Sequence, residues 1–399
     1  MARNDAFDAF DAFGAFDAFD AFDAFGGGGG QASSGRLAEA LIRSREGHLG
    51  RPARPPATAF DSYPGLIRNW GKGTGGTSAD KAKSLAMPEP GPHWLTRMDS
   101  RHRAQLCVAE LMQGVRFDDA GKAVAPGSLL HLNDTAELTL DRPSQAVFIE
   151  QTKRVESWAS LRSERAVEII AQIPPQQAFW SSIVHLNADA THYTNELLDV
   201  AVALASNVVQ QVKYRVVCPR PSEYSARIQP MIAVPGHFAW PSGHATQAFM
   251  IAELLSLLIL DPTSNTLKFQ WPEVRLQLLR QAERIATNRV VAGLHFPVDS
   301  TAGFVLGTKL AHMVVDSAVG RGVPNGQRRW ALSVESSTDG CDDFALLESL
   351  LALSRVHKLV DKPNEPGGAA FDLKPISCNT PIQWLWARAR SEWHDAGQV

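Results

Sequence analysis

The stretch "WPSGHATQAFMIAELLSLLIL", residues 240–260, joins a short polar segment to a long apolar run. Ser242, Gly243 and His244 come immediately before residues whose apolar spacing predicts a buried helix. Serine is a preferred N-cap residue, and glycine lets the backbone approach a ligand closely. Because the backbone N–H groups at a helix N-terminus attract anions, the stretch predicts a buried helix that begins at an anion site.

Apolar residues at spacings of three and four predict helices through much of the remaining chain. The predicted helices cover residues 102–115, 154–173, 191–214, 242–260, 272–291, 297–319, 342–359 and 381–393. The segment "SLLHLNDTAELTLDRP", residues 128–143, alternates around an Asn-Asp pair and predicts a small β-hairpin. We therefore expect an all-α fold, a helical bundle with one small hairpin.

The chain divides into four segments by composition. Residues 1–92 begin with Asp-Ala-Phe repeats and continue Gly- and Pro-rich, which predicts a low-complexity, largely disordered extension. Residues 93–145 hold a helix and the hairpin, which we expect to pack on a helical core at 146–318. Residues 319–399 form a loop-rich C-terminal segment with one or two helices.

Composition limits the classes of partner. The 399 residues are 44% hydrophobic and 20% charged with a net charge of −3, which gives no general attraction to nucleic acid or anionic membranes. The longest apolar stretch, Ala248–Leu260, is shorter than the roughly 20 residues of a membrane span. The N-terminus lacks the apolar core of a signal peptide. We expect no membrane span, no nucleic-acid partner and, by default, a cytoplasmic protein.

The four cysteines are widely separated and form no C-x-x-C pair, which argues against a zinc module or a redox dithiol. They are Cys107, Cys218, Cys341 and Cys378. We predict free thiols, and two disulfides are the alternative if the protein is exported.

Three polar clusters lie at predicted helix boundaries. They are "KYRVVCPRP" at 213–221, "PSGH" at 241–244 and "NRVVAGLHFPVD" at 288–299. Lys213, Arg220 and Arg289 supply three cations, which a helical core brings together only with an anion to compensate them. A cation about 4 Å from an anionic oxygen contributes on the order of 4 kcal/mol before desolvation. The planar forks of two arginines favour a phosphate-like oxyanion.

Two histidines in these clusters have proton-transfer or ligand chemistry. His244 lies beside the predicted oxyanion, where an ordinary imidazole pKa lets it act as a general acid. Asp299 is placed to accept the Nδ1 proton of His295, which leaves Nε2 free to attack or to bind a metal. Singly, each of these residues is more often a helix cap or a solvated charge, so the prediction depends on their conjunction.

The spacings K-x6-R-P, P-S-G-H and R-x5-H-x3-D resemble the signature of the superfamily that joins type 2 phosphatidic acid phosphatases (PAP2) with vanadium-dependent haloperoxidases. The resemblance covers about residues 150–318 and implies the helical bundle of that superfamily. Its third block normally begins Ser-Arg, whereas this chain has Asn288 before Arg289. That departure affects a local hydrogen bond more than the site itself.

The resemblance implies a role for each matching residue. The implied phosphate- or vanadate-binding residues are Lys213, Arg220, Ser242, Gly243 and Arg289. His244 becomes the acid–base residue. His295 becomes a phosphohistidine in the phosphatases or the axial vanadium ligand in the haloperoxidases, and Asp299 orients it.

The haloperoxidase branch fits this chain better, because the membrane phosphatases have several spans and the small acid phosphatases are exported and shorter. This branch implies vanadate as cofactor, hydrogen peroxide and halide as substrates, and a homodimer or larger assembly. His237 matches a histidine of vanadium bromoperoxidases, which implies a halide site for bromide or iodide. The alternative for His237 is a hydrogen-bonded loop histidine.

Two other functions stay open. One is a PAP2-type acid phosphatase that hydrolyses a phosphomonoester through a phosphohistidine and needs no metal. The other is an inactive oxyanion-binding module, which the retained pair of His244 and His295 argues against.

Overall fold

The computed structural model describes most of the chain from residue 91 onward. The described residues are 91–117, 127–133, 136–173, 176–259, 271–320, 328–332 and 378–394. The disorder predicted for residues 1–92 falls outside the described residues, except at residues 91 and 92. The helix predicted at 342–359 and Cys341 also fall outside them. Cys107, Cys218 and Cys378 are free thiols, as predicted.

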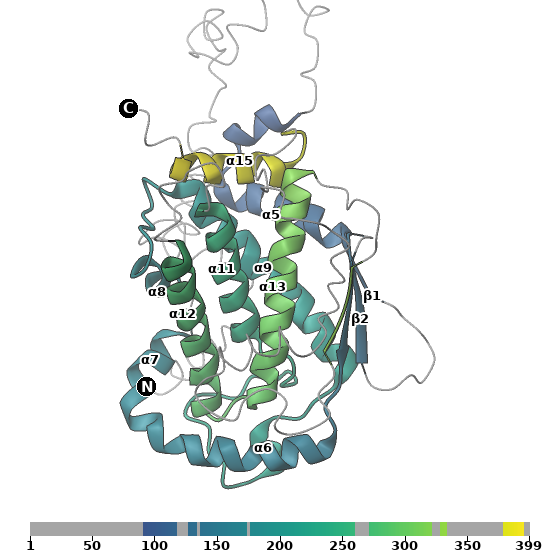
Figure 1. Ribbon diagram of the computed structural model, residues 1–399, viewed down its shortest axis with the longest axis vertical. Coiled ribbons are helices and arrows are strands. Elements are labelled where there is room, and N and C mark those ends of the chain that lie inside the picture. Colours follow the sequence, from purple (N-terminus) through teal and green to yellow (C-terminus); the bar gives the residue numbers. More distant parts are fainter. Residues whose placement is uncertain are drawn as a thin grey trace, which may run out of the picture. The chain divides into compact units, whose positions relative to one another are not determined.

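Four long helices form the centre of the bundle. Their bounds are α9 (His192–Val216), α11 (Gly243–Ile259), α12 (Trp271–Val291) and α13 (Pro297–Val319). Helices α9, α11 and α13 share one apolar core, and α12 packs on α11 (Figure 1). The ends of α13 follow from sequence, because proline is favoured at the first helical position and Gly320 adopts the left-handed conformation beyond the last, with φ 68°.

Two glycines on α13 allow its close approach to α11. A Cβ on Gly303 would lie 2.9 Å from the backbone oxygen of Ser242, and a Cβ on Gly307 would lie 3.0 Å from the backbone nitrogen of Met250. Side chains at these positions would therefore push the two helices apart. The contact holds the start of α11 against the start of α13, where the polar clusters lie.

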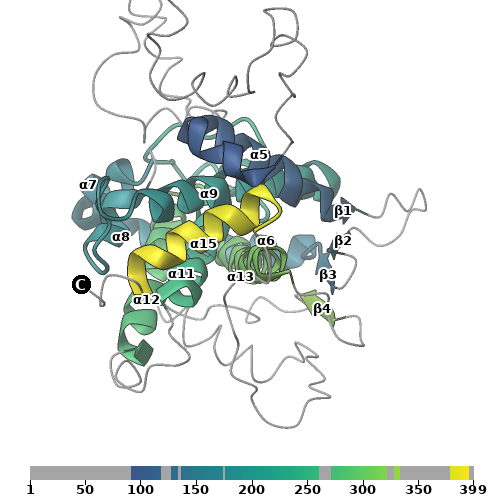
Figure 2. The same cartoon turned by 90° about the horizontal axis from the view of Figure 1, so that it is seen from above.

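Shorter helices cover the two ends of the bundle. At one end lie α6 (Gln145–Trp158) and α7 (Arg162–Ala171), joined by the 3-10 turn η3 (Ala159–Leu161), so a 3-10 turn interrupts the helix predicted at 154–173. At the other end α15 (Pro381–His394) crosses the bundle and packs on α9 and α13 together with α5 (Ser100–Gln113), as Figure 2 shows. The remaining short helices are η2 (Pro92–Arg97), α8 (Gln177–Ser181) and α10 (Pro221–Tyr224).

A small sheet packs beside the helices. Its strands, in sheet order, are β1 (Val115–Phe117), β2 (Gly127–Leu132), β3 (Ala136–Asp141) and β4 (Arg328–Leu332). The first three strands are antiparallel, and β4 pairs parallel with β3. Alternate leucines of β2 and β3 are buried, namely Leu130, Leu132, Leu138 and Leu140.

The predicted all-α bundle with a small hairpin is confirmed, and the hairpin is β2 with β3. The sheet also contains β1 and β4, which the sequence pattern did not predict. The division at residues 93–145, 146–318 and 319–399 stays a prediction.

One described helix, α13, is long and apolar enough to cross a membrane by length and composition. Most of it is buried among the other helices, and a core helix passes the same test. It is therefore weak evidence for a span, and the other described helices do not meet the criterion.

Candidate anion site

The three polar clusters meet at the end of the bundle that α6 covers. The N–H of Ala239 donates to the carbonyl of Cys218 at 2.8 Å, which ties the loop before α11 to the loop after α9. The N–H of Ser242 donates to the carbonyl of Asp299 at 3.0 Å, which ties the start of α11 to the start of α13. Segments from three parts of the chain thus form one site.

Lys213 lies in the last turn of α9 with its side chain buried. Its Nζ donates to the carbonyls of Phe238 at 2.6 Å and Ala239 at 3.1 Å, and lies 3.2 Å from Nδ1 of His237. Burial, and then the charge of Arg220, lower the lysine pKa well below its ordinary value. An anion beside it would restore the charged form.

Arg220 is the second buried cation and spans two loops. Its Nη1 donates to the carbonyl of Leu294 at 2.9 Å and lies 3.0 Å from Nε2 of His295. Its Nε donates to the carbonyl of His237 at 3.1 Å, and Nη2 lies 3.0 Å from His237 Nδ1. Burial lowers its pKa to about 10, so it stays charged at neutral pH.

The tautomer of His295 follows from its two neighbours. Nδ1 lies 2.8 Å from Oδ2 of Asp299, a carboxylate that also accepts the N–H of Phe296 at 2.9 Å. Because the carboxylate accepts, Nδ1 carries the proton and Nε2 keeps a lone pair, which faces Arg220. Burial, and then the charges of Arg220 and Lys213, hold the His295 pKa well below its ordinary value. The ring is therefore neutral, with Nε2 able to act as a nucleophile or ligand.

Arg289, near the end of α12, is fully buried. Its Nη2 donates to the carbonyl of Ile169 at 2.8 Å and to Oε1 of Gln172 at 3.1 Å. Its Nε and Nη1 have no acceptor in the part of the chain that the structure describes. Burial lowers its pKa to about 10. Two buried cationic donors without an acceptor are costly, and an oxyanion would satisfy them.

The N-terminus of α11 adds backbone donors. The carbonyl of Ser242 accepts the N–H of Thr246 at 3.0 Å, while the N–H groups of Gly243 and His244 have no acceptor among the described residues. A Cβ on Gly243 would meet only Val209, at 3.8 Å. The protein itself therefore leaves room for a side chain there, so any need for glycine comes from a guest beside the helix.

His244 is the second imidazole of the site and is partly buried. Its Nε2 lies 3.1 Å from the backbone oxygen of Gln172, which can only accept, so Nε2 carries the proton and Nδ1 keeps the lone pair. Burial, and then the charge of Arg289, lower its pKa to about 3. The charges of Lys213 and Arg220 contribute to the same lowering, so His244 lies within the field of all three cations. The anion-free site therefore holds His244 as a neutral base.

His237 lies at the edge of the site and is partly exposed. Its Nδ1 lies 3.2 Å from Nζ of Lys213, 3.0 Å from Nη2 of Arg220 and 3.1 Å from the carbonyl oxygen of Phe238. Burial and the charge of Lys213 lower its pKa to about 3. All nine residues predicted from the sequence thus lie in or beside the three joined loops, and their roles stay predictions.

Gln172, the C-cap residue of α7, belongs to the site but was not predicted from the sequence. Its Oε1 accepts from Arg289 at 3.1 Å and from Nδ2 of Asn288 at 3.0 Å, while its backbone oxygen contacts His244. Asn288, which replaces the usual serine, also accepts from Arg165 at 3.1 Å. No pattern marks Gln172 in the sequence, because it lies outside the three polar clusters and acts only through tertiary contacts.

Comparison with known proteins gives one match. The model of the PAP2 superfamily matches residues 196–321, which include all nine predicted site residues and exclude Gln172 and helix α7. No curated protein matches the chain.

Proposed function

We propose, from the match of residues 196–321 to the PAP2 superfamily, that the protein is a vanadium-dependent haloperoxidase that oxidises bromide or iodide with hydrogen peroxide. The observation that best supports this proposal is the position of His295. Its Nδ1 is hydrogen-bonded to Asp299, and its Nε2 presents a lone pair beside the guanidinium of Arg220. This arrangement suits an oxyanion that also takes one imidazole ligand.

The residues of the site fit vanadate. The two unpartnered nitrogens of Arg289, Nε and Nη1, and the leading N–H groups of α11 are donors for its oxygens. Lys213 and Arg220 would balance its charge, and His295 would bind the metal through Nε2. When bound, vanadate supplies Lewis-acid chemistry that makes hydrogen peroxide a stronger oxidant of halide.

The protein's own side chains move protons and position the small substrates. His244, neutral in the anion-free site, accepts a proton from hydrogen peroxide at Nδ1. His237 lies at the partly exposed edge of the site beside Lys213 and Arg220, which supports a role in holding halide or the departing hypohalous acid. The buried walls exclude bulk water and so strengthen each of these interactions.

The experiment is reconstitution of the metal-free full chain with orthovanadate. We expect bleaching of monochlorodimedone in the presence of bromide and hydrogen peroxide, and no bleaching without vanadate. His237→Phe should lower the rate with bromide while vanadate still binds. Vanadate binding without any halide oxidation would contradict the proposal.

The lone pair on Nε2 of His295 also supports a second function. In a PAP2-type phosphatase, His295 Nε2 would attack phosphorus as the phosphorus–oxygen bond to the leaving alcohol breaks, and His244 would protonate that alcohol. Water would then hydrolyse the phosphohistidine and release phosphate. The negative charge of bound phosphate raises the His244 pKa, which lets it carry the required proton.

Hydrolysis of p-nitrophenyl phosphate without vanadate, and its inhibition by vanadate, would support the phosphatase. If both assays are silent while phosphate still binds, the site is an inactive oxyanion-binding module. Vanadate-dependent bleaching without hydrolysis of p-nitrophenyl phosphate supports the haloperoxidase, and hydrolysis without bleaching supports the phosphatase.

A further inference from the structure

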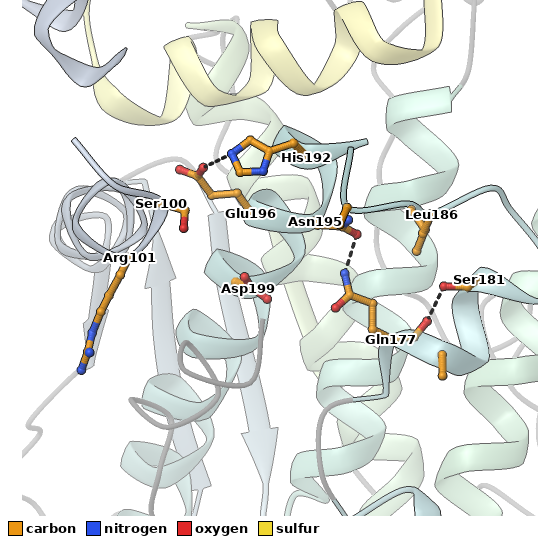
Figure 3. Close-up of a pocket in the computed structure, with 11 residues that line it drawn as sticks. Ser100, Arg101, Gln177, Ser181, Leu186, His192, Asn195, Glu196 and Asp199 are labelled. Carbon is orange, nitrogen blue, oxygen red and sulfur yellow. Dashed lines mark hydrogen bonds and ion pairs between the residues drawn. The ribbon is translucent and has the colours of Figure 1, made fainter. Parts of the chain in front are cut away.

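A second polar cavity lies toward the opposite end of α9 from Lys213. It has a volume of about 310 Å³ and lies among α5, α8, α9 and the loop before α9 (Figure 3). Its polar lining includes Ser100, Gln177, Asn195, Glu196 and Asp199. Asp199 and Lys213 are 14 residues apart on one helix, which corresponds to about 21 Å at the rise of an α-helix. The cavity is therefore separate from the candidate anion site.

The two carboxylates of this cavity differ in their partners. Glu196 accepts from Arg103, whose Nε lies 2.9 Å from Oε1 and whose Nη2 lies 2.6 Å from Oε2, and it lies 4.0 Å from Nε2 of His192. Its charge is compensated by this paired geometry.

Asp199 has no such partner among the residues that the structure describes. It is only 9% exposed, and its Oδ1 has no hydrogen-bond donor among the described residues. Burial, and then the like charge of Glu196, raise its pKa to about 9. Figure 3 shows Asp199 one turn beyond Glu196, while the side chain of Arg101 extends away from it.

Several amide and hydroxyl donors of the wall are already engaged. Nε2 of Gln177 donates to Oδ1 of Asn195, and Nδ2 of Asn195 donates to the carbonyl of Asn187 at 3.2 Å. The hydroxyl of Ser181 donates to the carbonyl of Gln177 at 3.0 Å. These contacts leave the carboxylate oxygen of Asp199 as the acceptor without a donor, so the cavity is suited to a guest that donates.

The walls also favour an organic guest over a bare ion. Ala178, Leu186 and Ala188 contribute apolar surface, and the volume is at the lower end of the range of small-molecule pockets. A guest that fills the cavity therefore combines a small carbon body with a positively charged donor.

We propose that this cavity binds a small organic ammonium ion, a protonated primary or secondary amine whose N–H groups donate to Asp199. The carbon body lies against Leu186 and the alanines, and the paired Glu196 adds to the negative field. This site goes beyond the proposed function and does not depend on it.

The test is calorimetric titration of the full chain with butylammonium and with ethylammonium chloride near neutral pH, in two buffers of different ionisation enthalpy. Sodium chloride controls for salt, and butanol controls for the apolar body. We expect binding in the millimolar range with release of close to one proton, because free Asp199 is protonated at that pH and ionises when the ammonium ion binds. Butanol should not bind.

The matched variants are Asp199→Asn and Asp189→Asn, the latter at an exposed position in the loop before α9. We expect Asp199→Asn to weaken butylammonium binding at least about tenfold and Asp189→Asn to leave it unchanged. The proton release of the unmodified chain is a second readout if the Asp199 variant fails to fold. Absence of binding by both amines, equal affinity in Asp199→Asn, or binding without proton release would overturn the proposal.

Discussion

The two ends of α9 contrast in the sign of the charge that they bury. Near its C-terminus lie the buried cations Lys213, Arg220 and Arg289, which outnumber the buried carboxylate of Asp299. Among the described residues, Nε and Nη1 of Arg289 have no acceptor and Oδ1 of Asp299 has no donor. Toward its N-terminus, Glu196 and Asp199 line a cavity, and the unpartnered group is a carboxylate oxygen. A buried polar group without a partner costs free energy, so each end indicates the charge of the guest that would relieve it. The contrast predicts an anion at one end and a cation at the other.

The largest expected effect comes from removing the lone pair of His295. We expect His295→Ala to lower turnover by about 10³-fold or more in whichever of the two reactions the protein catalyses, because no other group replaces Nε2. Steady-state kinetics measure the loss, and the exposed His102→Ala is the control. Full turnover in His295→Ala would refute the assigned role.

Arg289→Met removes the cation whose Nε and Nη1 have no acceptor among the described residues. Loss of charged hydrogen bonds worth about 1.5–3 kcal/mol predicts a fall in phosphate affinity of roughly 10- to 150-fold. The anion-free protein should be no less stable than the unmodified protein, because an uncompensated buried charge is gone. Calorimetry with phosphate and urea unfolding test the two halves, with Arg227→Met, at a largely exposed side chain, as the control. A variant with unchanged phosphate affinity would place the anion elsewhere.

Gln172 offers a finer test, since it holds Arg289 and Asn288 through its side chain and His244 through its backbone. Gln172→Ala should lower kcat about tenfold by loosening Arg289, whereas Gln172→Glu adds a negative charge that raises the His244 pKa and competes with the anion. The pH profile of kcat should therefore shift upward on its acidic side in Gln172→Glu alone. Identical pH profiles in the two variants would indicate a merely structural role.

We expect Asp199→Asn to leave turnover unchanged, which is the smallest effect on turnover among these variants. Its effect is on stability, because folding raises the Asp199 pKa from an ordinary value near 4 to about 9. The folded protein then holds a proton that the unfolded chain has released, so stability falls as pH rises from about 4 through 9. Asp199→Asn should lack this fall, and urea unfolding at several pH values would measure it. Parallel pH dependence in both proteins would show that Asp199 is not buried as an acid.

The sequence predicted most of what local rules control. Apolar spacing placed α9, α11 and α13 to within a few residues, and Pro297 with Gly320 marked the ends of α13. The three polar clusters were recognisable because residue types and spacings recur together at helix ends. In each case the signal lies within a few turns of chain.

What the sequence did not predict depends on contacts between distant segments. Strand β4 pairs with β3, although nearly all of the helical bundle lies between the two strands in the sequence. No local pattern therefore marks β4. Gln172 and the glycine contacts of α13 matter only once the helices have packed. In the sequence, Asp199 is indistinguishable from an ordinary polar residue on a helix face. Only the structure shows that it is buried in a cavity between α9, α5 and α8.

The central claim is that one tetrahedral oxyanion joins Lys213, Arg220 and Arg289 between two imidazoles. The most direct test is titration of the metal-free chain with orthovanadate, followed by calorimetry and competition with phosphate. We predict one vanadate per chain, displaced by phosphate, with affinity reduced in Arg220→Met and in Arg289→Met and unchanged in Asp199→Asn. Vanadate binding that is insensitive to both arginines, or that persists in full under saturating phosphate, would contradict this account.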